Sequence, residues 1–302
     1  MSGFLAGKVI AVSGAGRGVG RAVALAAAAE GASVVVNDYG VNIDGTEPSS
    51  KVADAVVREI LDAGGSAVGV ADTVTTMEGG QRIVQTAVDR FGKIDGVVCV
   101  AGILRERMLF NMTEEEWEGV VATHLKGTFT VFRAASALMR QQKSGTLIGF
   151  TSGAYASGSV SQANYAAAKG GIVSLVRSAA AGMYKYGVTA NCIAPIARTR
   201  MAANVPMQLQ EIGEAEDVAP LVVFLLSDRA RHITGQVYTA VGGKVAVWSV
   251  PTEVRAMQTD GRWTPEEIAS RIDSEIGQEK LPILEYLAKM REAAEAGSRP
   301  NA

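Results

Sequence analysis

Three side chains in the middle of the chain, Ser152, Tyr165 and Lys169, are of types that can exchange a proton with an alcohol. Tyr165 and Lys169 are four residues apart in a segment with helical periodicity, so both project from one face of the expected helix. A tyrosine with an ordinary pKa of about 10 is a poor base at neutral pH, but a neighbouring ammonium stabilises the phenolate and lowers that pKa. We therefore expect Tyr165 to act as acid and base, and Ser152 to donate a hydrogen bond to the developing carbonyl oxygen.

A Tyr-Lys pair at this spacing is common in helices, so the assignment also depends on a feature near the N-terminus. Residues 13–20 read Ser-Gly-Ala-Gly-Arg-Gly-Val-Gly, between an apolar strand-like segment and an alanine-rich segment. Glycines in such a turn let backbone N–H groups approach a pyrophosphate, and the following helix N-terminus adds a partial positive charge. Tight packing alone also produces glycine turns. The expected dinucleotide contacts are Gly14, Gly16, Arg17, Gly18, Val19 and Gly20.

Asp38 ends the next strand-like segment and bears on which dinucleotide binds. A carboxylate at this position accepts hydrogen bonds from the adenosine ribose hydroxyls and repels a 2′-phosphate. Arg17 acts in the opposite direction, because a guanidinium in the turn could pair with a 2′-phosphate. The sequence favours NAD(H) over NADP(H), with a solvated strand end as the alternative interpretation of Asp38.

The elements that must position these residues alternate along the chain. Short β-branched segments predict strands over 8–13, 33–38, 66–70, 94–100, 145–151, 188–193 and 236–240. Helical periodicity covers 19–29, 51–63, 79–91, 114–141, 164–186 and 216–227. This alternation predicts an α/β fold with a doubly wound, Rossmann-type parallel sheet of about seven strands and helices on both faces. Ligands of such sheets bind at the carboxyl ends of the strands.

The pattern changes near the C-terminus. We divide the chain into a Rossmann-type domain over residues 1–243 and a C-terminal extension over residues 244–302. Thr264 followed by Pro265 reads as a helix N-cap, and one or two amphipathic helices are expected from Pro265 to about Ala296. About 60 residues form a marginal core by themselves, so we expect the extension to pack on the domain or between subunits.

Composition narrows the classes of partner. The 302 residues carry a formal net charge of −2 without long runs of like charge, which argues against a nucleic-acid groove or a polybasic membrane anchor. No apolar stretch reaches membrane-spanning length, and the strand at Lys8 leaves no room for a signal peptide, so we expect a cytoplasmic location. Cys99 and Cys192 lie far apart in strand-like segments and are not expected to form a disulfide. A small-molecule substrate is the expected partner.

Together these motifs resemble the short-chain dehydrogenase/reductase family over residues 5–243. The matched positions are Ser152, Tyr165 and Lys169 of its catalytic signature and Gly14, Gly18 and Gly20 of its glycine pattern. The resemblance implies NAD(P)-dependent interconversion of a secondary alcohol and a ketone, with Lys169 also holding the nicotinamide ribose. It places Asp72 at the adenine and residues 195–199 beside the nicotinamide. The further cofactor contacts that it implies are Asp72, Thr73, Ala101, Gly102, Pro195, Ile196 and Thr199.

Two positions depart from the family pattern. An Asn-Asn-Ala-Gly stretch is replaced by Cys-Val-Ala-Gly at residues 99–102, which removes two side-chain amides. His124 stands where an asparagine usually completes a catalytic tetrad. A histidine could hold the water that relays protons from the lysine, or it could be a structural histidine satisfied by a backbone carbonyl.

Several segments are similar, more narrowly, to the (3R)-hydroxyacyl-CoA dehydrogenase modules of peroxisomal multifunctional β-oxidation enzymes. They are residues 37–38, 101–105, 124–127, 162–165 and 193–195, with the tail from 241 to 266. Those modules also carry a histidine at the position of His124. The likeness implies a 3-hydroxyacyl thioester or a steroid-like alcohol as substrate. Arg105 and Arg107 could meet a CoA phosphate, although exposed arginines usually serve only solvation.

Ala154, Tyr155, Met201 and Met207 are expected to overhang the substrate. Flexible apolar side chains suit an acyl chain or a ring system, although a Met-rich stretch is more often packing. The family resemblance implies a homodimer or homotetramer built on the long helices that begin near residues 114 and 164. Two rival functions are an NADPH-dependent 3-oxoacyl reductase and a non-catalytic dinucleotide-sensing protein. Retention of the tyrosine and the lysine argues against the second.

Overall fold

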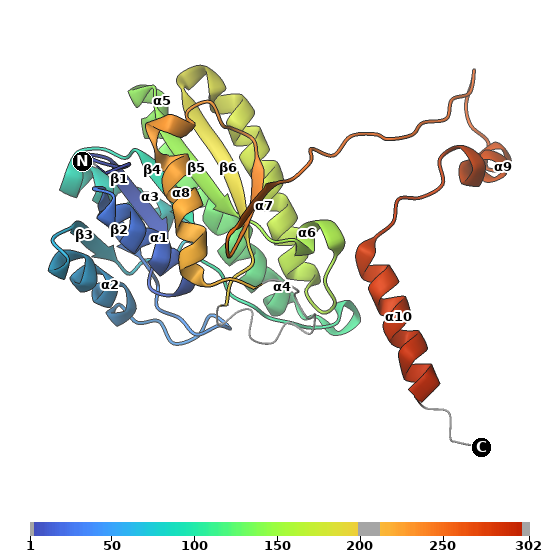
Figure 1. The fold of residues 1–302 in the computed structure, drawn as a ribbon, viewed down its shortest axis with the longest axis horizontal. Coiled ribbons are helices and arrows are strands. Elements are labelled where there is room, and N and C mark those ends of the chain that lie inside the picture. Colours follow the sequence, from blue (N-terminus) through green and yellow to red (C-terminus); the bar gives the residue numbers. More distant parts are fainter. Residues whose placement is uncertain (1–2, 199–211, 298–302) are drawn as a thin grey trace. The chain divides into compact units, whose positions relative to one another are not determined.

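The structure is a computed structural model that describes residues 3–198 and 212–297. The chain divides into two units, residues 1–248 and 249–302. The first unit holds an eight-stranded sheet in the order β3-β2-β1-β4-β5-β6-β7-β8 (Figure 1). Its strands are β1 Val9–Ser13, β2 Ser33–Asn37, β3 Ser66–Val70, β4 Gly96–Cys99, β5 Gly145–Phe150, β6 Val188–Pro195, β7 Val237–Val241 and β8 Lys244–Val247.

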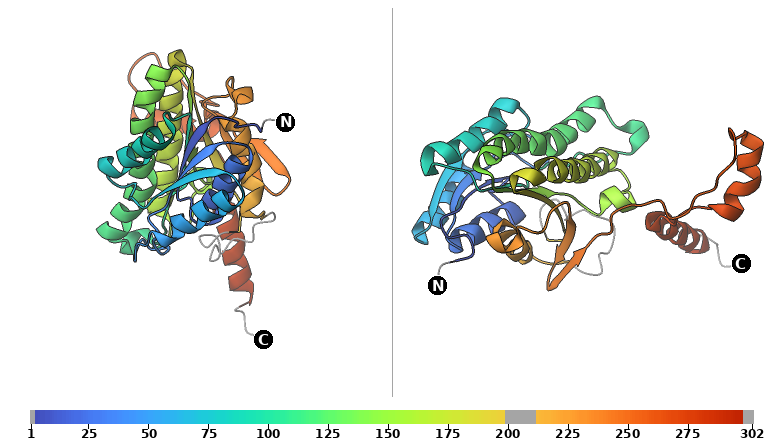
Figure 2. Two further views of the ribbon diagram at one scale, coloured as in Figure 1. Left: turned by 90° about the vertical axis from the view of Figure 1, so that its left-hand side faces the viewer. Right: turned by 90° about the horizontal axis from the view of Figure 1, so that it is seen from above.

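Helices cover both faces of this sheet (Figure 2). On one face α1, α2 and α8 contribute to a single apolar cluster, and on the other α3, α5 and α7 contribute to a second. The bounds are α1 Gly18–Ala29, α2 Lys51–Asp62, α3 Met77–Phe91, α4 Glu114–Val121, α5 Gly127–Gln142, α6 Ala154–Ser157, α7 Ala163–Met183 and α8 Ala219–Leu226. The predicted doubly wound, Rossmann-type fold is therefore confirmed.

Strand β1 shows why the sequence folds in this way. All five of its residues are buried, because a parallel strand that is covered on both faces needs apolar side chains on each. Ile10 and Val12 pack into the cluster beside α1, whereas Val9 and Ala11 pack into the cluster beside α3. Its parallel neighbours β2 and β4 align so that all three strands end at the same edge of the sheet.

Three details differ from the sequence expectation. The helix expected over 114–141 is interrupted by a π-helical segment, Ala122–Lys126, between α4 and α5. The short helix α6 was not predicted. Strand β8 pairs antiparallel with β7 and adds an eighth strand, so the first unit ends at residue 248 and not at 243.

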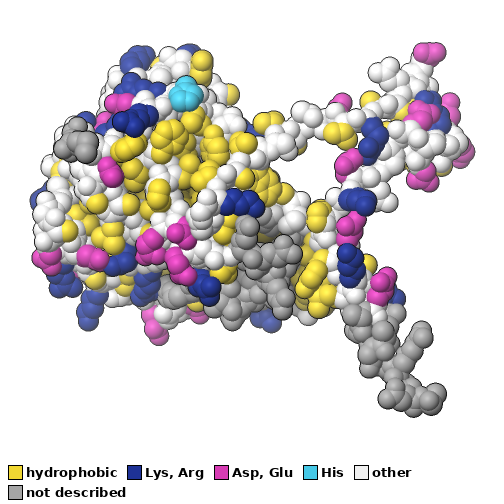
Figure 3. Space-filling view, in the orientation of Figure 1, with side chains coloured by type: hydrophobic (Ala, Val, Ile, Leu, Met, Phe, Trp, Pro, Cys, Tyr) yellow, Lys and Arg dark blue, Asp and Glu magenta, His cyan; other side chains and the backbone are white. Residues whose placement is uncertain are grey.

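On the face shown in Figure 3, apolar side chains gather over α8 and β8. Val245 and Val247 of β8 are both exposed, at 58% and 60%. An edge strand with exposed apolar side chains invites pairing with another surface.

The second unit contains α9 Pro265–Glu275 and α10 Pro282–Gly297. The N-cap expected before Pro265 is present, because Thr264 accepts a hydrogen bond from the backbone N–H of Glu267 while the Glu267 carboxylate accepts one from the backbone of Thr264. Across the described part of the chain, no helix is long and apolar enough to cross a membrane.

Candidate active site

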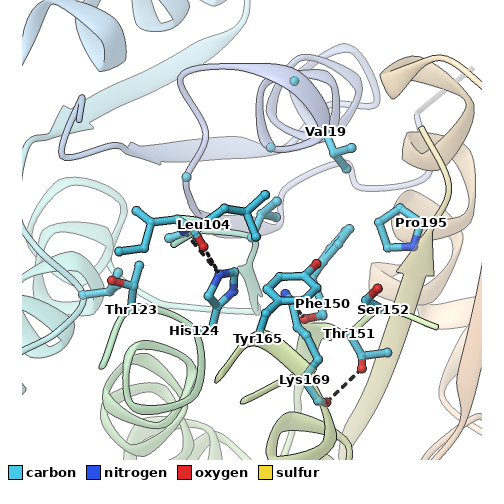
Figure 4. A pocket seen from close by; sticks show the side chains of 18 of the residues that line it. Val19, Leu104, Thr123, His124, Phe150, Thr151, Ser152, Tyr165, Lys169 and Pro195 are labelled. Carbon is cyan, nitrogen blue, oxygen red and sulfur yellow. Dashed lines mark hydrogen bonds between the residues drawn. The ribbon is translucent and has the colours of Figure 1, made fainter. Parts of the chain in front are cut away.

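The carboxyl ends of the strands border one cavity of about 820 Å³. The loops after β1, β2, β4, β5 and β6 all contribute to its wall. In Figure 4, Tyr165 lies between His124 and Ser152, with Val19 of the glycine turn across the cavity. The sequence-predicted residues that line it are Gly14, Arg17, Gly18, Val19, Gly20, Asp38, Asp72, Thr73, Ala101, Gly102, His124, Ser152, Ala154, Tyr165, Lys169, Pro195 and Ile196.

The glycine turn leaves no space for side chains. A Cβ on Gly14 would lie 2.6 Å from the backbone nitrogen of Ala101, and a Cβ on Gly20 would lie 2.0 Å from the carbonyl oxygen of Gly14. Helix α1 begins at this turn, and the residue at its N-cap, Arg17, makes no side-chain capping bond. The first N–H groups of α1 are thus left for another acceptor, which fits the pyrophosphate of a dinucleotide.

Asp38 lies directly after β2 at one end of the cavity. Its carboxylate accepts hydrogen bonds from the backbone N–H groups of Gly16, at 2.8 Å, and Gly40, at 2.7 Å. These bonds hold an acidic group beside the glycine turn, where the adenosine ribose of a dinucleotide would lie. The guanidinium of Arg17 donates to the carbonyl oxygen of Val41 at 3.2 Å, so it also lies at this end of the cavity.

The adenine side of the cavity is fixed by a buried asparagine. Asn37 donates from its side-chain amide to the carbonyl oxygens of Val70, at 3.0 Å, and Asp72, at 2.9 Å. This ties the end of β2 to the segment after β3. The Asp72 carboxylate pairs with Arg82 at 3.2 Å.

A buried network holds Tyr165 in the first turn of α7. The side-chain amide of Asn164 donates to the carbonyl oxygens of Arg105 and Glu116, both at 2.9 Å, and its oxygen accepts from the backbone N–H of Tyr165 at 2.7 Å. Asn164 is almost fully buried, so these bonds are protected from water. The phenol is therefore placed by contacts with the β4–α4 segment and α4 as well as by its own helix.

Lys169 is 4% exposed, and its Nζ donates to the carbonyl oxygen of Phe150 at 2.7 Å. Burial lowers the pKa of Lys169 to about 7. Its Nζ lies 5.4 Å from the centre of the Tyr165 ring. The ammonium is therefore near the phenol, but its resolved hydrogen bond goes to the end of β5.

The pKa of Tyr165 is raised, because burial disfavours the phenolate, and a hydrogen bond with Ser152 lowers it only in part. The sequence expectation that Lys169 lowers this pKa below its ordinary value is wrong for this structure. The expectation neglected desolvation of the phenol, and the lysine that it relied on is itself desolvated. At neutral pH the phenol is protonated and is ready to donate.

His124 lies in the π-helical segment and is 1% exposed. Its Nε2 lies 2.8 Å from the carbonyl oxygen of Ile103, and burial followed by the nearby Lys169 charge lowers the pKa of His124 well below its ordinary value. The ring is thus neutral, and its Nε2 lies within hydrogen-bond distance of both the carbonyl oxygen and the backbone N–H of Ile103, the latter at 3.2 Å, so its donor or acceptor role depends on the tautomer. Nδ1 has no partner among the described residues. The ring meets Tyr165 edge-on at 5.1 Å.

These contacts with the Ile103 backbone are compatible with a structural histidine, one of the two interpretations that the sequence left open. A Cβ on Gly102 would lie 2.2 Å from Cε1 of His124, so the glycine is needed for the histidine to fit. A role of His124 in carrying protons stays a prediction.

The chain is similar to known proteins both in sequence and in structure. Residues 14–244 match a family model described as enoyl-(acyl carrier protein) reductase. A crystal structure of a short chain dehydrogenase from Mycobacterium avium superposes with a TM-score of 0.83 at 44% identity, covering 92% of this chain and 97% of that one. The chain belongs to the short-chain dehydrogenase/reductase family. As a member, it is an oxidoreductase that acts on CH–OH donors and uses NAD or NADP.

Three relatives of this short-chain dehydrogenase carry names that describe different activities. A hydroxyacyl-CoA dehydrogenase of Mycobacterium tuberculosis is 40% identical over 284 residues, covering 89% of this chain and 88% of the relative. A peroxisomal hydratase-dehydrogenase-epimerase of Neurospora crassa is 38% identical over 298 residues, and this chain spans 33% of its length and is itself covered to 96%. A 3-oxoacyl-[acyl-carrier-protein] reductase of Synechocystis is 39% identical over 250 residues, covering 80% of this chain and 98% of the relative. The resemblance to the multifunctional-enzyme modules is confirmed.

Sequence reasoning missed several aromatic residues that line this dehydrogenase's cavity, among them Trp248. Trp248 lines the cavity, and its indole N–H donates to the Thr239 hydroxyl at 2.7 Å. Its ring lies 3.9 Å from the position of a Cβ on Gly153, next to Ser152. Tyr155, predicted to contact substrate, instead packs against Trp248 with ring centres 5.5 Å apart and is not part of the cavity wall. Trp248 and Ser152 are far apart in the sequence, so no local sequence pattern could predict that they lie close together.

The other positions that the sequence singled out are Gly16, Thr199, Met201 and Met207, together with the two cysteines. Gly16 lies behind the cavity against Asp38, where a Cβ would come within 2.8 Å of the carboxylate. Thr199, Met201 and Met207 lie outside the described residues. Cys99 and Cys192 are both free and buried, and burial raises the pKa of each thiol to about 12.

Proposed function

We propose that this short-chain dehydrogenase interconverts a 3-hydroxyacyl thioester, or a steroid-like alcohol, and the corresponding ketone with NAD(H). The observation that carries the proposal is the shared cavity, which is lined by Ser152, Tyr165 and Lys169 together with the glycine turn and Asp38. A bound nicotinamide would supply the hydride acceptor or donor, and every other step is assigned to the protein's own side chains.

Ser152 and Tyr165 are proposed to hold the substrate oxygen. In the reduction direction the protonated phenol donates its proton to the carbonyl oxygen as the carbinol C–H bond forms, and the Ser152 hydroxyl stabilises the charge that develops on that oxygen. In oxidation the phenolate takes the hydroxyl proton. Lys169, with a pKa of about 7, exchanges protons readily near neutral pH and can reprotonate the phenol through intervening water.

Two features support an acyl or ring-shaped substrate. Next to Ser152 the cavity wall includes the apolar ring of Trp248, which suits a hydrocarbon better than a sugar. Two of the relatives described above, the hydroxyacyl-CoA dehydrogenase and the 3-oxoacyl-[acyl-carrier-protein] reductase, are named for hydroxyacyl and oxoacyl substrates.

The preference for NAD is proposed from Asp38. Its carboxylate is held at the ribose end by two backbone N–H groups, so it cannot easily turn away from a 2′-phosphate. The second candidate function is an NADPH-dependent 3-oxoacyl reductase. It is favoured by Arg17, whose guanidinium lies at the same end of the cavity, and by the Synechocystis relative.

The test is a turnover screen of 3-hydroxyacyl-CoA and hydroxysteroid substrates with NAD and with NADP, following reduced-cofactor absorbance. NAD-dependent oxidation of a hydroxyacyl thioester is expected. Tyr165→Phe should lower kcat at least a thousandfold with little change in cofactor affinity, because the phenol acts on the proton. Tyr184→Phe, which alters a tyrosine that is 73% exposed, is the matched control. Full activity in Tyr165→Phe, or turnover with NADP alone, would contradict the proposal.

We also propose that the protein is a homodimer or homotetramer. The long helices α4 to α5 and α7, and the exposed β8 edge, are the surfaces that would be buried. Sedimentation equilibrium measures the subunit number directly. A monomer at micromolar concentration would contradict this part of the proposal.

A further inference from the structure

The connection from β2 to α2, residues 38–50, is long for a loop between a strand and a helix. It extends to the segment after β4, where the backbone N–H of Leu104 donates to the carbonyl oxygen of Ile43 at 2.9 Å. In the sheet, β2 and β4 lie on opposite sides of β1. The contact therefore spans the carboxyl end of β1, where the glycine turn begins.

Arg105 joins this loop to α4. Its Nε donates to the carbonyl oxygen of Asp44 at 3.0 Å, and its Nη1 donates to the carbonyl oxygen of Glu115 at 2.9 Å. The guanidinium also packs against Gly119, where an added Cβ would lie 3.2 Å from Nη1. The Arg105 side chain thus links the β2–α2 loop to α4 on the other side of the cavity.

The β2–α2 loop also makes hydrogen bonds within itself, next to the residues that contact residues 103–105. The backbone N–H of Asn42 donates to Thr46, and the backbone N–H of Gly45 donates to Asn42. Gly45 has a φ of +92°, and a Cβ on it would lie 3.2 Å from Cδ1 of Ile103. The tip of the loop is thus held together by its own backbone hydrogen bonds, in addition to its contacts with residues 103–105.

The same loop forms part of the cavity wall. Tyr39, Val41, Asn42 and Gly45 line the cavity on one side, and Ile103, Leu104 and Arg105 line it on the other. A dinucleotide that lies on the glycine turn, between Asp38 and Tyr165, must pass beneath the link between these two groups of residues. The link then stands between the bound molecule and solvent.

We propose that the β2–α2 loop forms a strap over the bound cofactor and that the hydrogen bonds of Arg105 hold this strap in place. Cofactor leaves after these hydrogen bonds break. The proposal rests on the proposed function only in that a dinucleotide occupies the cavity. Arg105 is a positioning residue, since its bonds go to backbone carbonyl oxygens and not to reacting atoms. Its sequence-based assignment to a CoA phosphate is replaced here by this role.

The test is the rate at which NADH leaves the protein, measured by stopped-flow fluorescence after mixing with excess NAD. Arg105→Lys keeps the positive charge but cannot make both hydrogen bonds, and the dissociation rate should rise about tenfold. Arg107→Lys is the matched control, because the Arg107 guanidinium pairs with Glu116 and, among the described residues, makes no hydrogen bond or ion pair with the loop. Gly45→Ala should speed release in the same direction from the other side of the link.

Hydrogen exchange gives a readout that does not depend on cofactor. In Arg105→Lys without nucleotide, amides of residues 39–47 and 104 should exchange faster than in the wild type, while those of α7 should not change. A fall in thermal midpoint with unchanged release would show that Arg105 is merely structural and would overturn the strap. Failure of the wild type to bind either NADH or NADPH would instead overturn the proposed function, and the strap with it.

Discussion

Replacing Lys169 with methionine should remove the contribution that makes the free energy of unfolding rise between pH 7 and pH 9. Lys169 is almost fully buried, and burial lowers its pKa from an ordinary 10.5 to about 7. In the unfolded chain the same amine keeps its proton throughout this range. The unfolded state therefore binds more protons than the folded state, and the free energy of unfolding rises with pH.

The size of the effect follows from the two pKa values. At pH 7 about half of the folded molecules have already released the Lys169 proton, and by pH 9 nearly all have. Integrating the difference in proton binding gives a gain in the free energy of unfolding of about 2 kcal/mol between pH 7 and pH 9. The buried thiols Cys99 and Cys192 act in the opposite direction, because their raised pKa destabilises the fold as unfolded thiolates form near pH 9.

The assay is urea denaturation at pH 7, 8 and 9 for the wild type and Lys169→Met. Both proteins share the cysteine contribution, so the difference between their pH slopes isolates the lysine. Lys51→Met removes an exposed ammonium and should keep the wild-type slope. Parallel curves for the wild type and Lys169→Met would refute the reasoning, since they would mean that Lys169 stays protonated in the fold.

Three further outcomes are expected. The kcat/KM for alcohol oxidation should rise from pH 7 toward pH 10, because the pKa of Tyr165 is raised and oxidation needs the phenolate; initial rates that fall over this range would contradict it. Asp38→Asn should reduce the preference for NAD over NADP at least tenfold in competition assays, because the repulsion of a 2′-phosphate is lost, and an unchanged ratio would remove the role given to Asp38. Gly20→Ala should abolish cofactor binding in fluorescence titration, because its Cβ would lie 2.0 Å from the Gly14 carbonyl oxygen, and normal affinity would mean that the turn is not used.

Local sequence signals predicted the features that depend on neighbouring residues. Strand β1 and the glycine turn follow from a run of buried apolar residues and the glycines after it. The Tyr165 and Lys169 pair follows from helical spacing. Parallel topology then brings these segments to one edge of the sheet, because all of the parallel strands end there.

The features that sequence reasoning missed depend on contacts between distant segments. Trp248 reaches the position beside Ser152 only because β8 folds back along β7. The bond from Lys169 to Phe150, and the desolvation that raises the pKa of Tyr165, depend on how deeply α7 packs against β5. The link through Arg105 joins two loops that are more than fifty residues apart, and neither loop has a periodicity from which it could be predicted.

Because residues 122–126 form a π-helical turn, the number of residues in this stretch determines the geometry of the helix. A π turn accommodates one more residue than an α turn. Deleting one residue here would let the stretch close as uninterrupted α-helix with α4 and α5 in nearly the same relative orientation, because the π turn and the α turn each complete about one full turn. The change would fall on the segment that holds His124, while the Glu116 carbonyl oxygen that supports Asn164 would keep its place.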